Sequence, residues 1–185
     1  MKAKYYTFNN DFDVGIAPQH QTMGSTYDYD APDSVYQLPF DGLPDFEPDF
    51  NTIFLDDRAI VTDLISSAPI RNCGWLISGR FRAIIDSFSM PLHRYYAVPV
   101  VHRGQKIPDY WWLQLPHPNI TIPPDASAAE AEEIIQSCNT LRDAAMFCLY
   151  RPPRFTYCFV QKDLRTAIED AGITGVRFGT SRLFR

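Results

Sequence analysis

The cysteines and histidines have the widest chemical repertoire in the chain, and their spacing argues against a metal site. There is no Cys-x-x-Cys pair, and the histidines do not cluster at the short spacings of zinc ligands. We therefore expect no metal and no cofactor, and we interpret the cysteines as buried thiols that pack as small hydrophobic groups. The residues concerned are Cys73, Cys138, Cys148, Cys158, His20, His93, His102 and His117.

Nucleophile and acid–base pairs can be assembled from the sequence, but each has a simpler structural interpretation. Cys73 with His93 would make a Cys–His nucleophile, yet Cys73 precedes an apolar strand and is better explained as a structural thiol. Asp56 and Asp57 would make a carboxylate pair for acid–base chemistry; before Arg58 they are more typical of a helix start. The phosphate-loop, nucleophile-elbow and His-Glu-x-x-His motifs are missing. The sequence therefore contains no recognisable catalytic constellation.

The aromatic run Tyr110-Trp111-Trp112 is the remaining candidate for a ligand site. It would suit a stacking platform for a small ligand or a single-stranded nucleic acid. A small-ligand-binding domain, or an enzyme with a Tyr/Trp-lined site, is therefore the alternative function. Arg103 and Lys106 are the nearest basic residues, so core packing of at least one Trp is the favoured interpretation.

Charge is distributed unevenly along the chain. Residues 1–66 hold 12 acidic against 3 basic residues, which leaves 10 acidic and 14 basic of the 22 and 17 in all. An acidic front part repels nucleic acid, so we expect no nucleic-acid partner. A basic protein partner fits this charge better, and a merely solvated acidic surface is the simpler alternative.

Neither a signal peptide nor a membrane span is expected. The opening residues are polar and aromatic, and no apolar run reaches the roughly 20 residues that a membrane helix needs. The predicted location is the cytoplasm, with no membrane partner.

The composition of the 185 residues predicts one α+β domain, with a mixed or antiparallel sheet and helices packed mainly on one face. Residues 1–62 form an irregular, acidic, Pro/Tyr-rich part, and residues 63–178 form the core. In the first part we expect short strands at Tyr5–Phe8 and Asn51–Leu55. Between them we expect turns held down by aromatic side chains. A short helix is expected over Ala59–Ser66.

The second part has clearer patterns. A strand at Trp75–Ile77 leads to Ser78, which caps a helix with an apolar stripe through Phe88. Further helices are expected from the capping box Ser127–Glu130 and over Lys162–Ala171, the latter ended by Gly172. Further strands are expected at Tyr95–Val101, Tyr110–Leu115, Ala144–Leu149, Phe155–Val160 and Ile173–Phe178.

Two stretches of the chain echo each other without gaps. Ile77–Asp86 and Val160–Glu169 both run from a strand end into a helix, with Phe81 matching Leu164 and Arg82 matching Arg165. Two such units would lay their helices on the same face of one sheet. The shared demands of amphipathic helices explain the echo equally well.

The stretch from Asp63 to Phe178 resembles bacterial polymorphic-toxin immunity proteins, and most closely immunity protein family eleven, formerly a domain of unknown function. The likeness rests on residues with structural rather than catalytic character. Its most specific part is the closing block Phe159–Phe178, in which the run Ala-Gly-Ile-Thr-Gly lies between a helix and a strand. The matching stretches are Asp63–Ser67, Leu76–Ile85, Tyr96–Val100, Tyr110–Gln114 and Phe159–Phe178.

The resemblance implies a non-enzymatic cytoplasmic protein that binds and neutralises a cognate toxin. Many intracellular toxins act on nucleic acids and are basic, so the acidic front part, which lies outside the resemblance, is our candidate toxin-binding surface. Buried aromatic anchors among steering charges are typical of such interfaces. The predicted interface residues are Tyr36, Phe40, Asp41, Asp45, Phe46, Glu47, Asp49, Tyr110 and Trp112.

Overall fold

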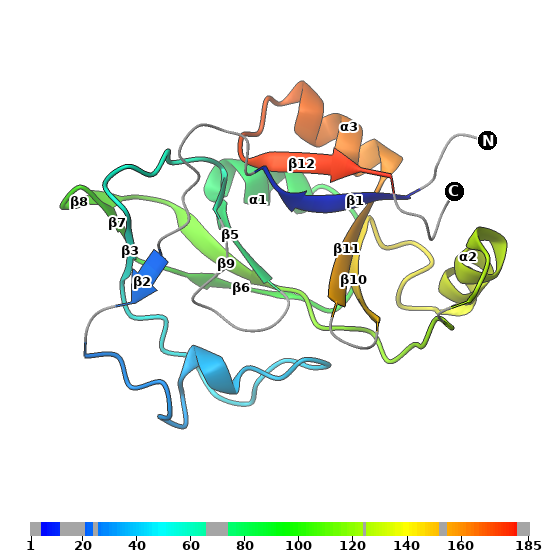
Figure 1. The fold of residues 1–185 in the computed structure, drawn as a ribbon, viewed down its shortest axis with the longest axis horizontal. Coiled ribbons are helices and arrows are strands. Elements are labelled where there is room, and N and C mark those ends of the chain that lie inside the picture. The colour runs from blue at the N-terminus through cyan, green and yellow to red at the C-terminus, as the bar shows by residue number, and fades with distance from the viewer. Residues whose placement is uncertain are drawn as a thin grey trace.

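The computed structural model describes residues 5–11, 21–23, 26–65, 74–123, 125–151 and 155–180, and these form an α+β fold (Figure 1). The helices are α1 (Gly79–Ile85), α2 (Ala128–Ser137) and α3 (Lys162–Asp170), with a 3-10 turn η1 (Val35–Gln37). The strands are β1 (Tyr5–Asn10), β2 (Gln21–Met23), β3 (Ile53–Leu55), β4 (Leu64–Ile65), β5 (Gly74–Ser78), β6 (Arg94–Ala97), β7 (Val100–His102), β8 (Gln105–Ile107), β9 (Tyr110–Gln114), β10 (Met146–Arg151), β11 (Phe155–Gln161) and β12 (Val176–Gly179).

The described strands form three four-stranded sheets, in the orders β4-β5-β9-β6, β10-β11-β1-β12 and β2-β3-β7-β8. The first two are antiparallel throughout, and the third is mixed because β3 and β7 run parallel. The predicted α+β class with mixed or antiparallel sheets is therefore confirmed.

The caps read from the sequence are present. Ser78 Oγ accepts a hydrogen bond from the Phe81 amide at the start of α1. Ser127 and Glu130 form the capping box of α2, with both reciprocal bonds made. Gly172 follows α3 with φ +63°, the left-handed conformation that glycine adopts without strain.

Two of the expected secondary-structure elements are wrong. Residues 59–65 form no helix, because Leu64 and Ile65 pair as β4 with Ile77 and Leu76 of β5; Ser66 lies outside the described residues. The strand expected over Tyr95–Val101 breaks after Ala97, and its second half becomes β7 in another sheet. Pro99 lies in the break, where the missing amide proton costs no ladder hydrogen bond.

The first two sheets, each with a helix, are two copies of one arrangement. We call β4, β5, α1, β9 and β6 the first unit, and β10, β11, α3, β1 and β12 the second unit. In each unit a helix directly follows the second strand of the sheet and packs over the second and third strands. The third strand of the second unit, β1, comes from the N-terminal part of the chain.

The registers of the two sheets agree residue for residue. Ile77 of β5 pairs with Trp111 of β9, and its counterpart Val160 of β11 pairs with Tyr6 of β1. The hydrogen bond from the Ser78 amide to the Asp63 carbonyl, 2.8 Å, recurs as one from the Gln161 amide to the Ala145 carbonyl, also 2.8 Å. The equivalent positions are Leu64 and Met146, Ile77 and Val160, Trp111 and Tyr6, Leu113 and Phe8, and Tyr95 and Phe178.

The matched arginines of the two helices make the same contacts. Arg82 pairs with Asp86 at 3.3 Å and stacks over the rings of Tyr95 and Trp111, 4.5 and 4.1 Å from their centroids. Arg165 pairs with Glu169 at 2.8 Å and stacks over Tyr6 and Phe178, at 4.3 and 5.5 Å. The echo in the sequence therefore reflects a repeated structure. The expectation that both helices lie on one sheet is wrong, because each packs on the sheet of its own unit.

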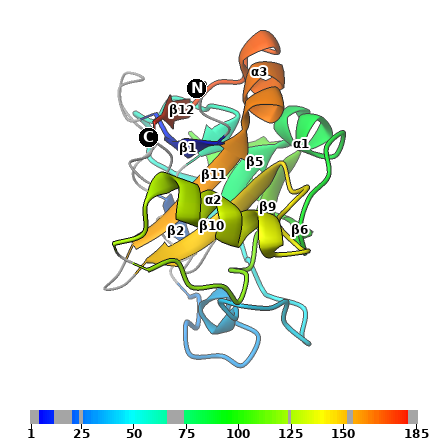
Figure 2. The same ribbon diagram turned by 90° about the vertical axis from the view of Figure 1, so that its right-hand side faces the viewer.

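The two units share one core between their helix-bearing faces. Phe81 and Leu164 are both fully buried there, as predicted, and α1 and α3 pack against each other (Figures 1 and 2). The opposite face of each sheet has its own cover. In the second unit α2 packs on Tyr5, Phe147 and Phe159, with Ala131 and Ile135 turned inward. In the first unit the cover combines the third sheet, through Ile53, Leu55 and Val100, with a stretch of little regular structure, residues 26–50.

Candidate partner-binding surface

The stretch 26–50, which we call the acidic segment, carries seven carboxylates and no lysine or arginine. It is the blue-to-cyan stretch that runs below the sheets in Figures 1 and 2. Every one of its acidic side chains is exposed, so the negative charge faces solvent. The acidic residues are Asp28, Asp30, Asp33, Asp41, Asp45, Glu47 and Asp49.

Tyr27 holds the acidic segment in shape. Its buried hydroxyl accepts a hydrogen bond from the Val35 amide (2.8 Å) and donates one to the Asp49 carbonyl (2.7 Å). The Asp49 amide in turn donates to the Asp33 carbonyl at 2.8 Å. These bonds tie the beginning, middle and end of the segment together. A stretch without an α-helix or a β-ladder thereby satisfies the backbone groups that it buries.

Apolar side chains anchor the acidic segment on the first unit. Val35, Leu38 and Phe50 are buried in a cluster that includes Tyr96 and Trp112. The Phe50 ring lies 5.2 Å from that of Tyr96 and 6.2 Å from that of Trp112. The segment is therefore a packed cover of the sheet.

Polar contacts from the strand below fix one turn of this segment, residues Pro39–Gly42. The buried Gln114 amide nitrogen lies 3.4 Å from the Pro39 carbonyl and 3.2 Å from the Gly42 carbonyl, and donates to both. The backbone amide of His117 donates to the carbonyl of Phe40 at 2.7 Å. The Gln114 carbonyl oxygen accepts from Tyr96 Oη at 3.1 Å, which orients the side-chain amide.

The fixed turn presents two side chains to solvent. Phe40 is 53% exposed although its backbone is held, and its ring lies 5.8 Å from that of His117. Asp41 is exposed, and its carboxylate has no ion-pair partner within the described ranges. Complete burial of a phenylalanine side chain contributes about 1.5–3 kcal/mol of free energy. The half of the Phe40 ring that stays exposed contributes none of this to folding and remains available for contact with a partner.

The other predicted interface residues of the acidic segment also lie at its surface. Tyr36 is half-buried and stacks edge-on against Tyr29, 4.8 Å between ring centroids. Phe46 is half-buried, whereas Asp45, Glu47 and Asp49 are exposed. Asp49 Oδ1 accepts a hydrogen bond from the Asn51 amide at 2.8 Å.

Tyr110 and Trp112 must be removed from the predicted interface because both are buried. Trp112 is inaccessible to solvent and packs against Phe50, which confirms the interpretation of a core Trp. The Tyr110 hydroxyl donates to the Thr62 carbonyl at 2.6 Å, and burial raises the pKa of this phenol. Neither ring can therefore stack on a ligand, which removes the structural basis of a Tyr/Trp-lined site at these positions.

Several exposed residues, and one residue that fixes the backbone of the turn, were not predicted from the sequence. Leu92 is 59% exposed beside the turn, and Tyr29 is 41% exposed. Gln114 had a signal in the sequence. It follows Tyr110 and Trp112 at two-residue spacing and so shares their face of β9. A buried amide on that face needs polar partners.

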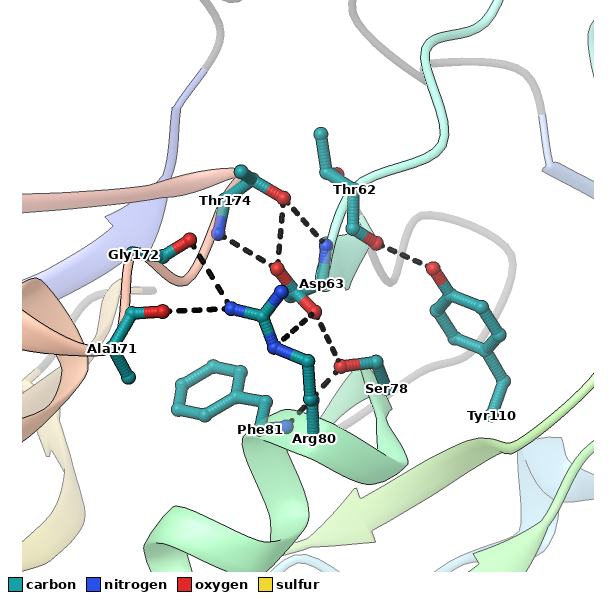
Figure 3. A network of polar contacts seen from close by, with 9 residues as sticks. All are labelled: Thr62, Asp63, Ser78, Arg80, Phe81, Tyr110, Ala171, Gly172 and Thr174. Carbon is teal, nitrogen blue, oxygen red and sulfur yellow. Dashed lines mark hydrogen bonds and ion pairs between the residues drawn. The ribbon is translucent and has the colours of Figure 1, made fainter.

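The residues that carry the family resemblance meet in a different place, a polar joint between the units (Figure 3). Asp63 accepts hydrogen bonds from the amide and hydroxyl of Thr174, both 2.9 Å, and from Ser78 Oγ at 2.7 Å. Arg80 donates to the Ala171 carbonyl at 2.7 Å, at the end of α3. The joint connects the start of α1 with the loop after α3. Ser66 and Ser67 of the same motif lie outside the described residues.

The electrostatics of the joint favour an ionised Asp63. Burial opposes ionisation, but the hydrogen bonds from Thr174 and Ser78 outweigh it and hold the pKa of Asp63 below its ordinary value. Gly175 follows with φ +80°, and a Cβ there would lie 2.4 Å from the Leu64 carbonyl oxygen. These motif residues thus hold the units together.

The described cysteines, which were the other candidates for chemistry, lie in or beside the core. Cys148 and Cys158 are buried thiols, as predicted, and Cys138 is half-buried; Cys73 and His20 lie outside the described residues. Among the described side chains, no group of three or more His, Cys, Asp and Glu is arranged to hold a metal ion. Along the same ranges, no helix has both the length and the apolar character needed to cross a membrane.

Comparison with protein-family models finds no match, and comparison with curated proteins finds none either.

Proposed function

We propose that this chain is a non-enzymatic, cytoplasmic immunity protein that binds a basic toxin domain and neutralises it. The observation that carries the proposal is the fixed turn Pro39–Gly42, which presents an exposed Phe and an exposed Asp inside a segment without positive charge. A rigid surface of this kind suits protein binding, because little conformational freedom is lost on association.

Charge and apolar contacts have separate roles in the proposed interface. The carboxylates of the acidic segment attract a positively charged domain and speed the encounter. Phe40 and the half-buried Tyr36 and Phe46 supply the apolar contact that carries most of the affinity. A toxin that acts on nucleic acid needs a basic surface for phosphate groups, and the acidic segment would occupy that surface.

The resemblance to immunity proteins supports the same conclusion from other residues. Three of its stretches, Asp63–Ser67, Leu76–Ile85 and Phe159–Phe178, supply the Asp63 joint, which stabilises the scaffold and leaves the acidic segment to bind the partner. The turn is tied to the motif residues through Gln114, whose amide donates to the Pro39 and Gly42 carbonyls.

The test is co-expression in a bacterial host with the toxin domain encoded in the neighbouring gene, followed by binding measurements with the purified pair. We expect growth to be rescued and a stable complex to form. A toxin that kills equally with and without the folded chain, and that does not bind it, would contradict the proposal.

A charge variant locates the interface. Replacing Asp41, Asp45, Glu47 and Asp49 by Asn or Gln should slow association by about tenfold or more at low salt and flatten its salt dependence. The matched control removes the same four charges at exposed positions elsewhere. Equal kinetics of the two variants would move the interface away from the acidic segment. The control residues are Asp125, Glu133, Asp163 and Asp170.

A further inference from the structure

A small cleft of about 190 Å³ opens beside the fixed turn. It lies between Asp41 of the turn and three other stretches, residues 91–92, 116–119 and 140–141. Pockets for small molecules typically measure about 300–1,000 Å³. This cleft therefore has room for one long side chain rather than for a complete small ligand.

The lining of the cleft combines apolar walls with one charge. The walls include Pro91, Leu92, Pro116 and Leu141, which offer aliphatic surface and no hydrogen-bond donor in their side chains. Among the described residues that line it, Asp41 is the only carboxylate, and His117, Asn119 and Thr140 add polar side chains.

We propose that this cleft receives one lysine or arginine side chain of the partner; the proposal rests on the protein-binding function inferred above. These side chains bury an aliphatic stem on apolar surface and carry their charge at the tip. The stem packs against the prolines and leucines, and the cation pairs with the Asp41 carboxylate. A neutral aliphatic side chain would desolvate Asp41 without a partner, and an acidic one would be repelled.

The rim of the cleft explains how the ion pair is kept from water. Leu92, 59% exposed, lines the cleft itself, and Phe40, 53% exposed, contacts the lining residue His117. A partner that covers both side chains excludes solvent from the pair, as the surrounding contacts of an interface hot spot do. Desolvation strengthens the attraction between the two charges.

The acceptor is also held in place before binding. Gln114 and His117 fix the backbone on both sides of Asp41 through the carbonyls of Pro39, Phe40 and Gly42. The carboxylate therefore needs no reorganisation of the turn to meet an incoming cation.

The first arm of the test needs no toxin. The ¹⁵N-labelled protein is titrated with N-acetyl-arginine amide, N-acetyl-lysine amide and N-acetyl-norleucine amide, the last of which has a similar stem without charge. We expect saturable shift changes of the Leu92, His117 and Leu141 amides with the two cationic probes only. These changes should vanish in Asp41→Asn and persist in Asp33→Asn, which removes an equal charge from the same segment. Changes spread evenly over the acidic segment, or none at all, would overturn the cleft as a cation site.

The second arm uses the toxin domain encoded in the neighbouring gene. Asp41→Asn should weaken binding by about tenfold or more, as expected for a desolvated charged hydrogen bond. Asp33→Asn should change it by less than about fivefold, as expected for an exposed charge. Equal affinities of the two variants overturn the cleft proposal and leave the immunity function intact. A toxin that does not bind the wild-type chain refutes that function, and the probe titration then decides the cleft by itself.

Discussion

The outer faces of the two units lie on equivalent strands but have different covers. Ile65 and Leu76 of the first unit correspond to Phe147 and Phe159 of the second. The second pair is covered by α2, whose apolar side chains pack on the sheet while its helical hydrogen bonds satisfy its own backbone. The first pair is buried in a cluster formed by residues of the third sheet and of the acidic segment. The acidic segment needs Tyr27, Gln114 and His117 to satisfy its backbone groups.

This difference shows two ways of shaping the surface above a sheet. A helix shows solvent a regular surface fixed by its period, whereas an irregular cover can hold a turn such as Pro39–Gly42 in a chosen position. The repeated strands and helices determine that the chain folds, and the acidic segment distinguishes one half of the molecule from the other.

The largest loss of stability is expected from substitutions in the core, where the two units are most alike. Phe81→Ala and Leu164→Ala should each lower the free energy of unfolding by about 2–5 kcal/mol, because each empties an equivalent place in the shared core. Urea denaturation followed by circular dichroism measures both. If one substitution has no effect, the two helices are not equivalent in the core.

A smaller effect should appear where the units differ. Asp63 corresponds to Ala145, so the carboxylate joint exists on one side only. Asp63→Asn should lower the free energy of unfolding by about 1–3 kcal/mol at pH 7.

The contribution of Asp63 should also depend on pH. Its pKa in the folded state is depressed, so the stabilisation is present above the unfolded-state pKa of about 4 and is lost as pH falls through the folded-state value. The difference between wild type and Asp63→Asn should therefore shrink below about pH 4. A difference that stays constant between pH 7 and pH 3 would contradict a role for the ionised carboxylate.

The smallest effect concerns the stacked arginines. Arg82→Met and Arg165→Met keep most of the stem but remove the cation from its aromatic partners and its i,i+4 acid. Each should cost about 0.5–1 kcal/mol, and the two costs should be equal within error because the contacts correspond. Differential scanning calorimetry of both variants checks the equality. Unequal costs would mean that the pairs match in position but not in energy.

The sequence predicted elements wherever local patterns decide the structure. Ser78, Ser127 and Gly172 act through neighbouring backbone groups, so their roles follow from spacing alone. The repeat between Ile77–Asp86 and Val160–Glu169 was also visible. Its pairing was not, because β1 joins the second unit from a distant part of the sequence.

The predictions failed where contacts between residues far apart in the sequence determine the structure. The spacing of Ile60 and Leu64 suggests a helix, but Leu64 is drawn into β4 by its ladder with β5. Of the candidate interface, Phe40 and the carboxylates lie at the surface as expected. Tyr110 and Trp112 are buried instead. Alternation along a strand assigns side chains to two faces of the sheet, but it does not reveal that both faces are covered.

The position of β1 also bears on how the molecule forms during synthesis. Tyr5–Asn10 leaves the ribosome before either unit exists, yet both of its ladder partners, β11 and β12, are made after all the other strands. The first unit can pair its strands as they emerge, whereas the second must wait for the C-terminal stretch of the chain. Pairing across so long a sequence separation slows folding, because the entropy of closing the loop is lost before the contacts form. Until then residues 5–10 lack their ladder partners and expose Tyr and Phe side chains, which makes the incomplete chain prone to aggregation.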